Sequence, residues 1–168
     1  AEIGCRIVAV SDINGGCYNS KGLNIQTLIE HNLSTGSVRA FPNTEPITNT
    51  DLLTMKCEIL VPAALGEVIN HQNAHDIKAQ VILEAANHPI TPYAESILTQ
   101  RGIHILPDLF VNAGGVTVSY FEWVQDIQRL FWDKDEVDRK LEKVMKQSFE
   151  QVRYTSEHSN TDFRTAAL

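Results

Sequence analysis

The chain has 168 residues, of which 43% are hydrophobic and 21% charged, and its formal net charge is −7. This composition is ordinary for a folded domain and argues against disorder. The negative charge argues against nucleic acid as a partner, because phosphate binding needs a basic surface. No apolar run approaches the ~20 residues of a membrane span and no secretory leader opens the chain, so we expect a cytoplasmic protein with no membrane partner.

The three cysteines also indicate a cytoplasmic protein. Cys5, Cys17 and Cys57 are an odd number and form no Cys-x-x-Cys pair. They fit reduced thiols in a cytoplasmic protein better than a disulfide framework.

Short apolar runs and helical periodicity alternate along the chain. The predicted strands are residues 6–10, 57–61, 81–84 and 103–106. The predicted helices are 23–33, a brief one capped by Thr50 and Asp51, 93–100, 116–131 and 134–158, with another beginning after 160. Residues 41–49 are predicted to be a loop. The alternation predicts an α/β fold, a doubly wound, mostly parallel Rossmann-like sheet followed by long C-terminal helices, in one domain over residues 1–168.

Ser11 and Asp12 follow the first predicted strand. An acidic residue at the end of the second strand of a dinucleotide fold commonly binds the adenosine ribose hydroxyls. However, Asn14-Gly15-Gly16 follows and is a strong turn signal. Asp12 could therefore equally be a turn-forming residue.

Two later strand ends also carry candidate ligand-binding residues. Ala63 and Ala64 are small and leave room for a flat ring or a ribose, although tight packing at a strand-to-helix turn would favour the same residues. Asn87 lies beyond the next strand, where it could contact a ligand or simply stabilise the turn.

The stretch Asn112-Ala-Gly-Gly-Val-Thr-Val-Ser-Tyr-Phe-Glu-Trp123 organises the chain. Its two adjacent glycines let the backbone turn tightly and let another molecule approach closely. Val116, Ser119 and Trp123 fall at helical spacing and share one face. This pattern fits a small-molecule pocket at a strand-to-helix turn, and it also fits a helix start with glycine packing and no ligand.

His71 and His75 are four apart on a predicted helix, which is the spacing of two metal ligands on one face. No Glu follows His71 directly and no third ligand is suggested nearby. We therefore expect a solvated helix face and no metal site.

Several stretches together are recognisable: Asn112-Ala-Gly-Gly-Val116, Ser119-Tyr-Phe-Glu-Trp-Val-Gln125, Val10-Ser-Asp12, Val61-Pro-Ala-Ala-Leu65, Glu84-Ala-Ala-Asn87, Leu106-Pro-Asp108 and Arg164-Thr-Ala-Ala167. From end to end and in order, the chain closely resembles the glutamate dehydrogenase branch of the amino-acid dehydrogenases acting on Glu, Leu, Phe and Val. The resemblance implies a carboxyl-terminal, partial NAD(P)-binding domain of an enzyme that deaminates L-glutamate reversibly to 2-oxoglutarate and ammonia.

The resemblance also implies roles for individual residues. Asp12 would bind the adenosine ribose, Asn87 the nicotinamide-side ribose and Asn112 the carboxamide. The cofactor-binding residues expected on this basis are Ser11, Asp12, Ala63, Ala64, Asn87 and Asn112. The substrate-binding residues expected are Val116, against the glutamate methylenes, and Ser119, at its side-chain carboxylate.

Parts of such an enzyme are not found in these 168 residues. No Gly-x-Gly occurs, so the first strand, the Gly-rich turn and their helix are expected elsewhere. The family's catalytic Lys and Asp lie in an amino-terminal substrate domain, so no catalytic residue is expected in this chain, which alone should be inactive.

Two points concern the cofactor and the assembly. Asp12 would repel a 2′-phosphate and so favours NAD, although Lys21 is close in sequence and NADP stays possible. We expect a homo-oligomer. A leucine- or phenylalanine-type dehydrogenase and a non-catalytic interaction module are the alternatives, and the Ser119 hydroxyl argues against the former.

Overall fold

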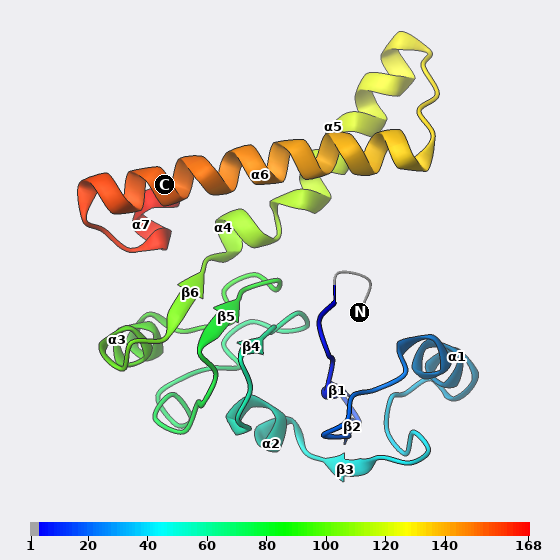
Figure 1. Ribbon diagram of the computed structural model, residues 1–168, viewed down its shortest axis with the longest axis vertical. Coiled ribbons are helices and arrows are strands. Elements are labelled where there is room, and N and C mark those ends of the chain that lie inside the picture. The colour runs from blue at the N-terminus through cyan, green and yellow to red at the C-terminus, as the bar shows by residue number, and fades with distance from the viewer. Residues whose placement is uncertain (1–3) are drawn as a thin grey trace. The chain divides into compact units, whose positions relative to one another are not determined.

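The computed structural model describes residues 4–168, which divide into two compact units (Figure 1). The first unit runs to Cys57 and includes residues 76–78; the second comprises Glu58–His75 and Ala79–Leu168. The first holds β1 (Ala9–Asp12), β2 (Gly15–Tyr18), α1 (Ile25–Thr35), β3 (Glu45–Ile47) and α2 (Asn49–Thr54). The second holds β4 (Ile59–Leu60), β5 (Val81–Leu83), α3 (Pro92–Gln100), β6 (His104–Leu106), α4 (Asp108–Val111), α5 (Ala113–Gln128), α6 (Lys134–Ser159) and α7 (Phe163–Ala167).

The first unit is built on an antiparallel sheet in the order β1-β2-β3. Its core is formed by the buried side chains of Cys17 on β2, Leu28 on α1 and Val38. The α1 helix begins where the side chain of Asn24 accepts a hydrogen bond from the backbone of Thr27, and it ends at Gly36, whose φ of 76° is left-handed.

This sheet and the helix after it correct four predictions. The first strand, predicted at residues 6–10 in a parallel sheet, spans Ala9–Asp12 and pairs with an antiparallel neighbour. Gly15 and Gly16 belong to β2 itself, because the turn is at residues 13–14. Only glycine fits at position 16, where a Cβ would lie 2.7 Å from the backbone oxygen of Val10. The predicted loop at 41–49 contains β3, and α2 is capped by Thr48 and Asp51 in a capping box, not by Thr50.

The second unit contains the predicted parallel sheet, in the order β4-β5-β6. Apolar side chains of the strands and of α3 form its core: Leu60, Ile82, Ala94, Leu98 and Ile105 are all buried. The α3 helix is capped by Thr91 and carries Pro92 in its first turn, as the sequence predicts. Residues 71–76, predicted to be helical, form turns instead.

Helices α4 to α7 follow the last strand of this sheet (Figure 1). Phe149 of α6 packs between Phe110 of α4 and Phe163 of α7. The α5 helix begins at Ala113 and ends at Gln128, three residues earlier at each end than predicted. None of the helices between residues 4 and 168 is long and apolar enough to cross a membrane.

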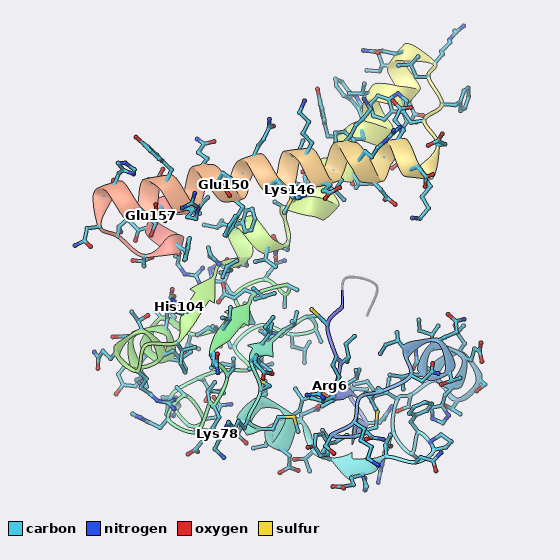
Figure 2. The ribbon with its side chains drawn as sticks, in the orientation of Figure 1. Arg6, Lys78, His104, Lys146, Glu150 and Glu157 are labelled. Carbon is cyan, nitrogen blue, oxygen red and sulfur yellow. The ribbon has the colours of Figure 1, made fainter. Side chains whose placement is uncertain are left out.

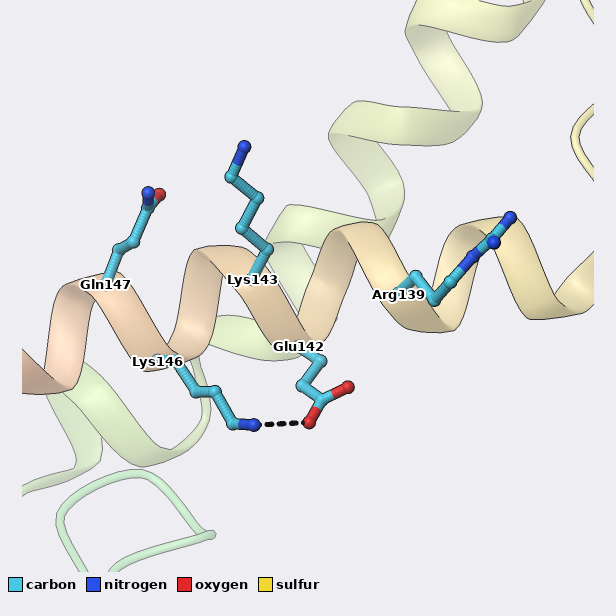
Figure 3. A pocket seen from close by; sticks show the side chains of 5 residues that line it. All are labelled: Arg139, Glu142, Lys143, Lys146 and Gln147. Carbon is cyan, nitrogen blue, oxygen red and sulfur yellow. Dashed lines mark ion pairs between the residues drawn. The ribbon is translucent and has the colours of Figure 1, made fainter.

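The outer face of α6 is charged, as the alternating charges of its sequence predict. Figure 2 shows that it carries Lys146, Glu150 and Glu157. A shallow hollow on this helix is lined by α6 side chains alone, and in it the ammonium of Lys146 lies 2.6 Å from the carboxylate of Glu142 (Figure 3). Pairs at this i, i+4 spacing stabilise a solvated helix surface, so this face is scaffold.

Candidate cofactor and substrate site

The site candidates of the second unit gather at one edge of its parallel sheet. Because β4, β5 and β6 are parallel and in register, their carboxyl ends point to the same edge. Ligands of open α/β sheets bind outside this edge. Ala63 and Ala64 lie on the loop after β4, Asn87 lies on the loop after β5, and Asn112 follows β6 and α4.

Asn87 and Asn112 are directly joined. The side-chain amide of Asn112 donates a hydrogen bond of 2.6 Å to the side-chain oxygen of Asn87. Asn112 also separates α4 from α5, but its side chain caps neither helix. The pair leaves the side-chain oxygen of Asn112 and the amide of Asn87 without another hydrogen bond among the described residues. The two groups therefore present an acceptor and a donor at the sheet edge.

The loop after β4 is held against the loop after β5. The backbone N–H of Ala86 donates to the oxygen of Pro62 at 2.9 Å, and that of Glu67 donates to the oxygen of His88 at 2.8 Å. Gly66 permits this approach, because a Cβ there would lie 3.1 Å from the backbone oxygen of Asn87. The exposed Ala63 and Ala64 are thus carried on a loop that flanks Asn87.

The start of α5 supplies a bare helical surface. Gly114 and Gly115 lie in the first turn of the helix, so the predicted tight turn at these glycines is wrong. Gly114 faces α6, where a Cβ would lie 3.8 Å from a methyl group of Leu141, whereas a Cβ on Gly115 would meet nothing within 4 Å. Val116 is 71% exposed, and the hydroxyl of Ser119 donates to the oxygen of Gly115 at 3.2 Å.

A buried charge cluster lies behind this edge, and no prediction from the sequence assigned it a role. Arg164 of α7 pairs with Glu84 at 2.7 Å, Glu95 at 2.8 Å and Asp108 at 3.0 Å. Glu84 is fully buried, and its Oε1 has no hydrogen-bond partner. Burial raises the pKa of Glu84 despite its bonds to Asp108 and Arg164. The pKa of Asp108 is lowered, because hydrogen bonds from His88, Leu109 and Arg164 outweigh its burial.

Asp12 lies in the first unit, at the end of β1. Its carboxylate accepts three hydrogen bonds of 2.7 Å, from the backbone of Asn14, the hydroxyl of Ser37 and the backbone of Val38. Burial opposes its ionisation, but these bonds outweigh burial and lower the pKa of Asp12. The bond to Asn14 is the turn contact considered above, and the other two fix the segment after α1. Ser11 precedes Asp12 on β1, opposite Gly16.

His71 and His75 line an open hollow of about 580 Å³ together with Thr91 and Tyr93. Within residues 4–168, no three His, Cys, Asp or Glu side chains gather in a way that could hold a metal ion.

The carboxyl edge of the parallel sheet thus carries the amide pair and exposed small side chains, and the glycines at the start of α5 follow it. Known proteins resemble the chain in sequence and fold. The Glutamate/Leucine/Phenylalanine/Valine dehydrogenase family matches residues 1–168. The chain belongs to this family. It is 51% identical over 166 residues to the glutamate dehydrogenase of Thermotoga maritima, a match covering 99% of the chain and 40% of that protein.

Solved dehydrogenases of the family share the fold. The hetero-hexameric glutamate dehydrogenase of Thermus thermophilus is 31% identical, with a TM-score of 0.91 over 99% of this chain and 39% of its own. The glutamate dehydrogenase of Peptoniphilus asaccharolyticus is 31% identical, with a TM-score of 0.81 over 99% of this chain and 38% of its own. The predicted family and α/β fold class are thus confirmed. The chain spans about 40% of the length of the Thermotoga maritima relative.

The structure brings Ala63, Ala64, Asn87 and Asn112 to one sheet edge. It leaves Val116 and Ser119 exposed on α5, the helix that follows. Sequence reasoning missed Glu84, Asp108, Arg164 and Gly66. One signal was available for the first of these: Glu84 directly follows the apolar run Val81-Ile-Leu83, and a carboxylate at the end of a buried strand needs a buried partner.

Proposed function

We propose that the whole protein is an NAD(P)-dependent glutamate dehydrogenase, converting L-glutamate reversibly to 2-oxoglutarate and ammonia. In this proposal the present chain contributes part of the cofactor site and part of the substrate pocket. The observation that carries the proposal is the bonded pair of Asn87 and Asn112 at the carboxyl edge of the sheet. The likeness to glutamate dehydrogenases over 99% of the chain supports it.

The residues present fit a nicotinamide cofactor. The amide pair offers a donor and an acceptor, which match a ribose hydroxyl and a carboxamide. The alanines and Gly115 leave room for flat rings. When bound, the cofactor would supply the hydride acceptor for the glutamate α-carbon. Asn112 would orient the carboxamide and Asn87 would hold the ribose, so that one ring face is presented to the substrate.

The substrate residues are proposed on α5. Val116 would pack against the glutamate methylenes, and Ser119 would donate a hydrogen bond to the side-chain carboxylate. In the structure that hydroxyl donates to the backbone oxygen of Gly115, so it must rotate to serve the substrate. A purely apolar substrate side chain offers this hydroxyl no partner, which favours glutamate over leucine.

The test is steady-state kinetics on the full-length protein with glutamate and with leucine, and with Asn112→Ala and Asn87→Ala. We expect turnover of glutamate, and a rise in the KM for NAD of roughly fivefold in each variant, because one hydrogen bond to a ligand contributes on the order of 1 kcal/mol. Asn32→Ala, on the exposed surface of α1, is the control and should change nothing. Turnover of leucine but not of glutamate would refute the substrate, and unchanged KM values would refute the site.

For the cofactor we propose NAD over NADP. Asp12 carries a negative charge whose ionised form is held by three hydrogen bonds, and that charge would repel a 2′-phosphate. Titration of the full-length enzyme with both reduced cofactors measures the preference. Tighter binding of NADPH would show that basic residues such as Lys21 dominate over Asp12.

We also propose that the whole protein is a homo-oligomer in the cytoplasm. Large apolar side chains are exposed along α5 and the turn after it, namely Tyr120, Trp123, Ile127 and Phe131. Exposed apolar patches of this kind mark surfaces that another chain or segment covers. Light scattering of the full-length protein tests the assembly, and a monomeric mass would refute it.

A further inference from the structure

We propose that Arg164 is a positioning residue of the cofactor site. It holds Asp108 in place and, through Asp108, the amide pair formed by Asn87 and Asn112. This inference rests on the proposed function, since it takes that amide pair to be the cofactor-binding element. Arg164 itself is on α7 and belongs to the charge cluster behind the sheet edge.

The guanidinium of Arg164 is engaged on three sides. Its Nε donates to both carboxylate oxygens of Glu95, at 2.8 and 2.9 Å. Its Nη1 donates to Oδ1 of Asp108 at 3.0 Å, and its Nη2 donates to Oε2 of Glu84 at 2.7 Å. A rigid planar group with donors in three directions can join three carboxylates at once, which the single ammonium of a lysine cannot reproduce.

Asp108 connects this guanidinium to both members of the amide pair. The backbone N–H of His88, the residue after Asn87, donates to Oδ2 of Asp108 at 2.8 Å. The backbone N–H of Asn112 donates to the main-chain oxygen of Asp108 at 3.1 Å. The Asp108 carboxylate thus holds the backbone next to Asn87 directly, and the main chain of Asp108 holds the backbone of Asn112 through the i, i+4 bond that ends α4.

Asp108 keeps its position only if Arg164 neutralises it and the neighbouring carboxylate of Glu84. Its Oε2 accepts both the backbone N–H of Asp108, at 2.8 Å, and Nη2 of Arg164. Without the guanidinium, two buried carboxylates would lie together with no cation between them. Like charges at this distance repel strongly in a buried site. Asp108 would then shift or take up a proton, and the hydrogen bonds that locate the amide pair would loosen.

The structure also offers a matched control. Arg153 of α6 pairs with Glu150 and Glu157, both at 2.7 Å, on an exposed helix face away from the amide pair. Replacing Arg153 makes the same change of charge as replacing Arg164 and also breaks ion pairs. It leaves the contacts of Asp108 untouched.

The experiment measures the dissociation constant for NADH of the full-length enzyme by fluorescence titration. We expect Arg164→Lys and Arg164→Gln to raise it on the order of tenfold, which corresponds to about 1.4 kcal/mol of binding free energy. Arg153→Gln should leave it unchanged. The decisive readout is the double variant with Asn112→Ala: if Arg164 acts through the pair, its replacement should add little once Asn112 has lost its amide.

The outcomes separate this inference from the proposed function. If Asn112→Ala alone leaves NADH binding unchanged, the proposed cofactor site is wrong and this inference is overturned with it. If Asn112→Ala weakens binding while Arg164→Lys does not, the cofactor site stands and the role of Arg164 is overturned. Fully additive effects would likewise overturn it. Glu95→Gln, which loosens only the outer side of the cluster, provides the same test if Arg164→Gln fails to fold, and it should weaken binding less than Arg164→Lys.

Discussion

Arg164 and Glu84 are 80 positions apart in the sequence, and the guanidinium Nη2 of one lies 2.7 Å from the carboxylate Oε2 of the other. Glu84 ends the run of a buried strand and is fully buried, whereas Arg164 comes from the last helix of the chain. The pair therefore ties α7 to the middle strand of the parallel sheet. A buried carboxylate requires such a partner, because leaving an ion unpaired in the protein interior is costly.

This pair predicts an ordering of stability effects. Arg164→Met removes the cation that three carboxylates share and should lower the free energy of unfolding by about 3–5 kcal/mol, the usual cost of breaking a buried pair from one side. Glu84→Gln should cost less, because the amide oxygen can still accept from Asp108 and Arg164. Arg153→Gln, on the exposed face of α6, should leave the urea midpoint nearly unchanged. Urea denaturation of the three variants measures the order, and a larger loss for Glu84→Gln than for Arg164→Met would contradict it.

Replacing Gly115 at the start of α5 by alanine should stabilise the fold and weaken ligand binding. Gly115→Ala meets nothing within 4 Å, so it should stabilise the protein by roughly 0.5–1 kcal/mol through helix propensity. The same methyl group would occupy the surface that the proposed ligands approach, so the KM for NAD or for glutamate should rise several-fold.

Gly114→Ala is the control for this prediction. Its Cβ would make an ordinary contact with Leu141, so it should stabilise the helix without changing either KM. Thermal unfolding and steady-state kinetics on the same full-length preparations make the comparison. Equal KM values for the two variants would mean that the open side of Gly115 does not face a ligand.

Much of the second unit could be predicted from its sequence. The strand β5 is a short run of β-branched and apolar residues bounded by turn signals, and Thr91-Pro92 marks the start of α3. Strand β2 was missed because Gly15 and Gly16 are depleted in strands, and strand β3 was missed because Pro46 breaks ladders. β2 forms by pairing with β1, and β3 forms by pairing with β2, so both strands depend on contacts between segments and not on a local preference.

The candidate site, too, could be predicted only in part from the sequence. Ala63, Asn87 and Asn112 could be placed near one another, because the carboxyl ends of parallel strands share an edge. The hydrogen bond between the two asparagines could not be predicted, since it depends on how the loop after β5 meets the end of α4. The role of Arg164 depends on where α7 docks, and nothing in the local sequence of α7 indicates that position.

Ser119 predicts a difference between substrates. A hydrogen bond to a charged group contributes about 1.5–3 kcal/mol, so Ser119→Ala should lower kcat/KM for glutamate roughly 10- to 100-fold. The rate with leucine, which offers that hydroxyl no partner, should change far less. Val116→Ala should instead reduce kcat/KM for both substrates, because it removes apolar contact that both would make. An unchanged preference for glutamate in Ser119→Ala would reject this role.

Asp12 predicts an acid-dependent contribution to stability. Hydrogen bonds from Ser37, Val38 and Asn14 outweigh burial and lower the pKa of Asp12 in the folded chain. A group whose pKa is lower when folded stabilises the fold fully above its unfolded pKa of about 3.9, and that contribution is lost as the pH falls through the folded pKa.

Asp12→Asn removes this dependence. The difference in unfolding free energy between the wild type and Asp12→Asn should be constant from about pH 7 to pH 5 and should shrink below about pH 4, where Asp12 begins to be protonated. Ser37→Ala removes one of the three hydrogen bonds and should give a smaller acid-dependent part with the same sign. Urea denaturation at a series of pH values measures both. A difference that persists undiminished to pH 2 would show that Asp12 stabilises the segment after α1 by its shape and not by its charge.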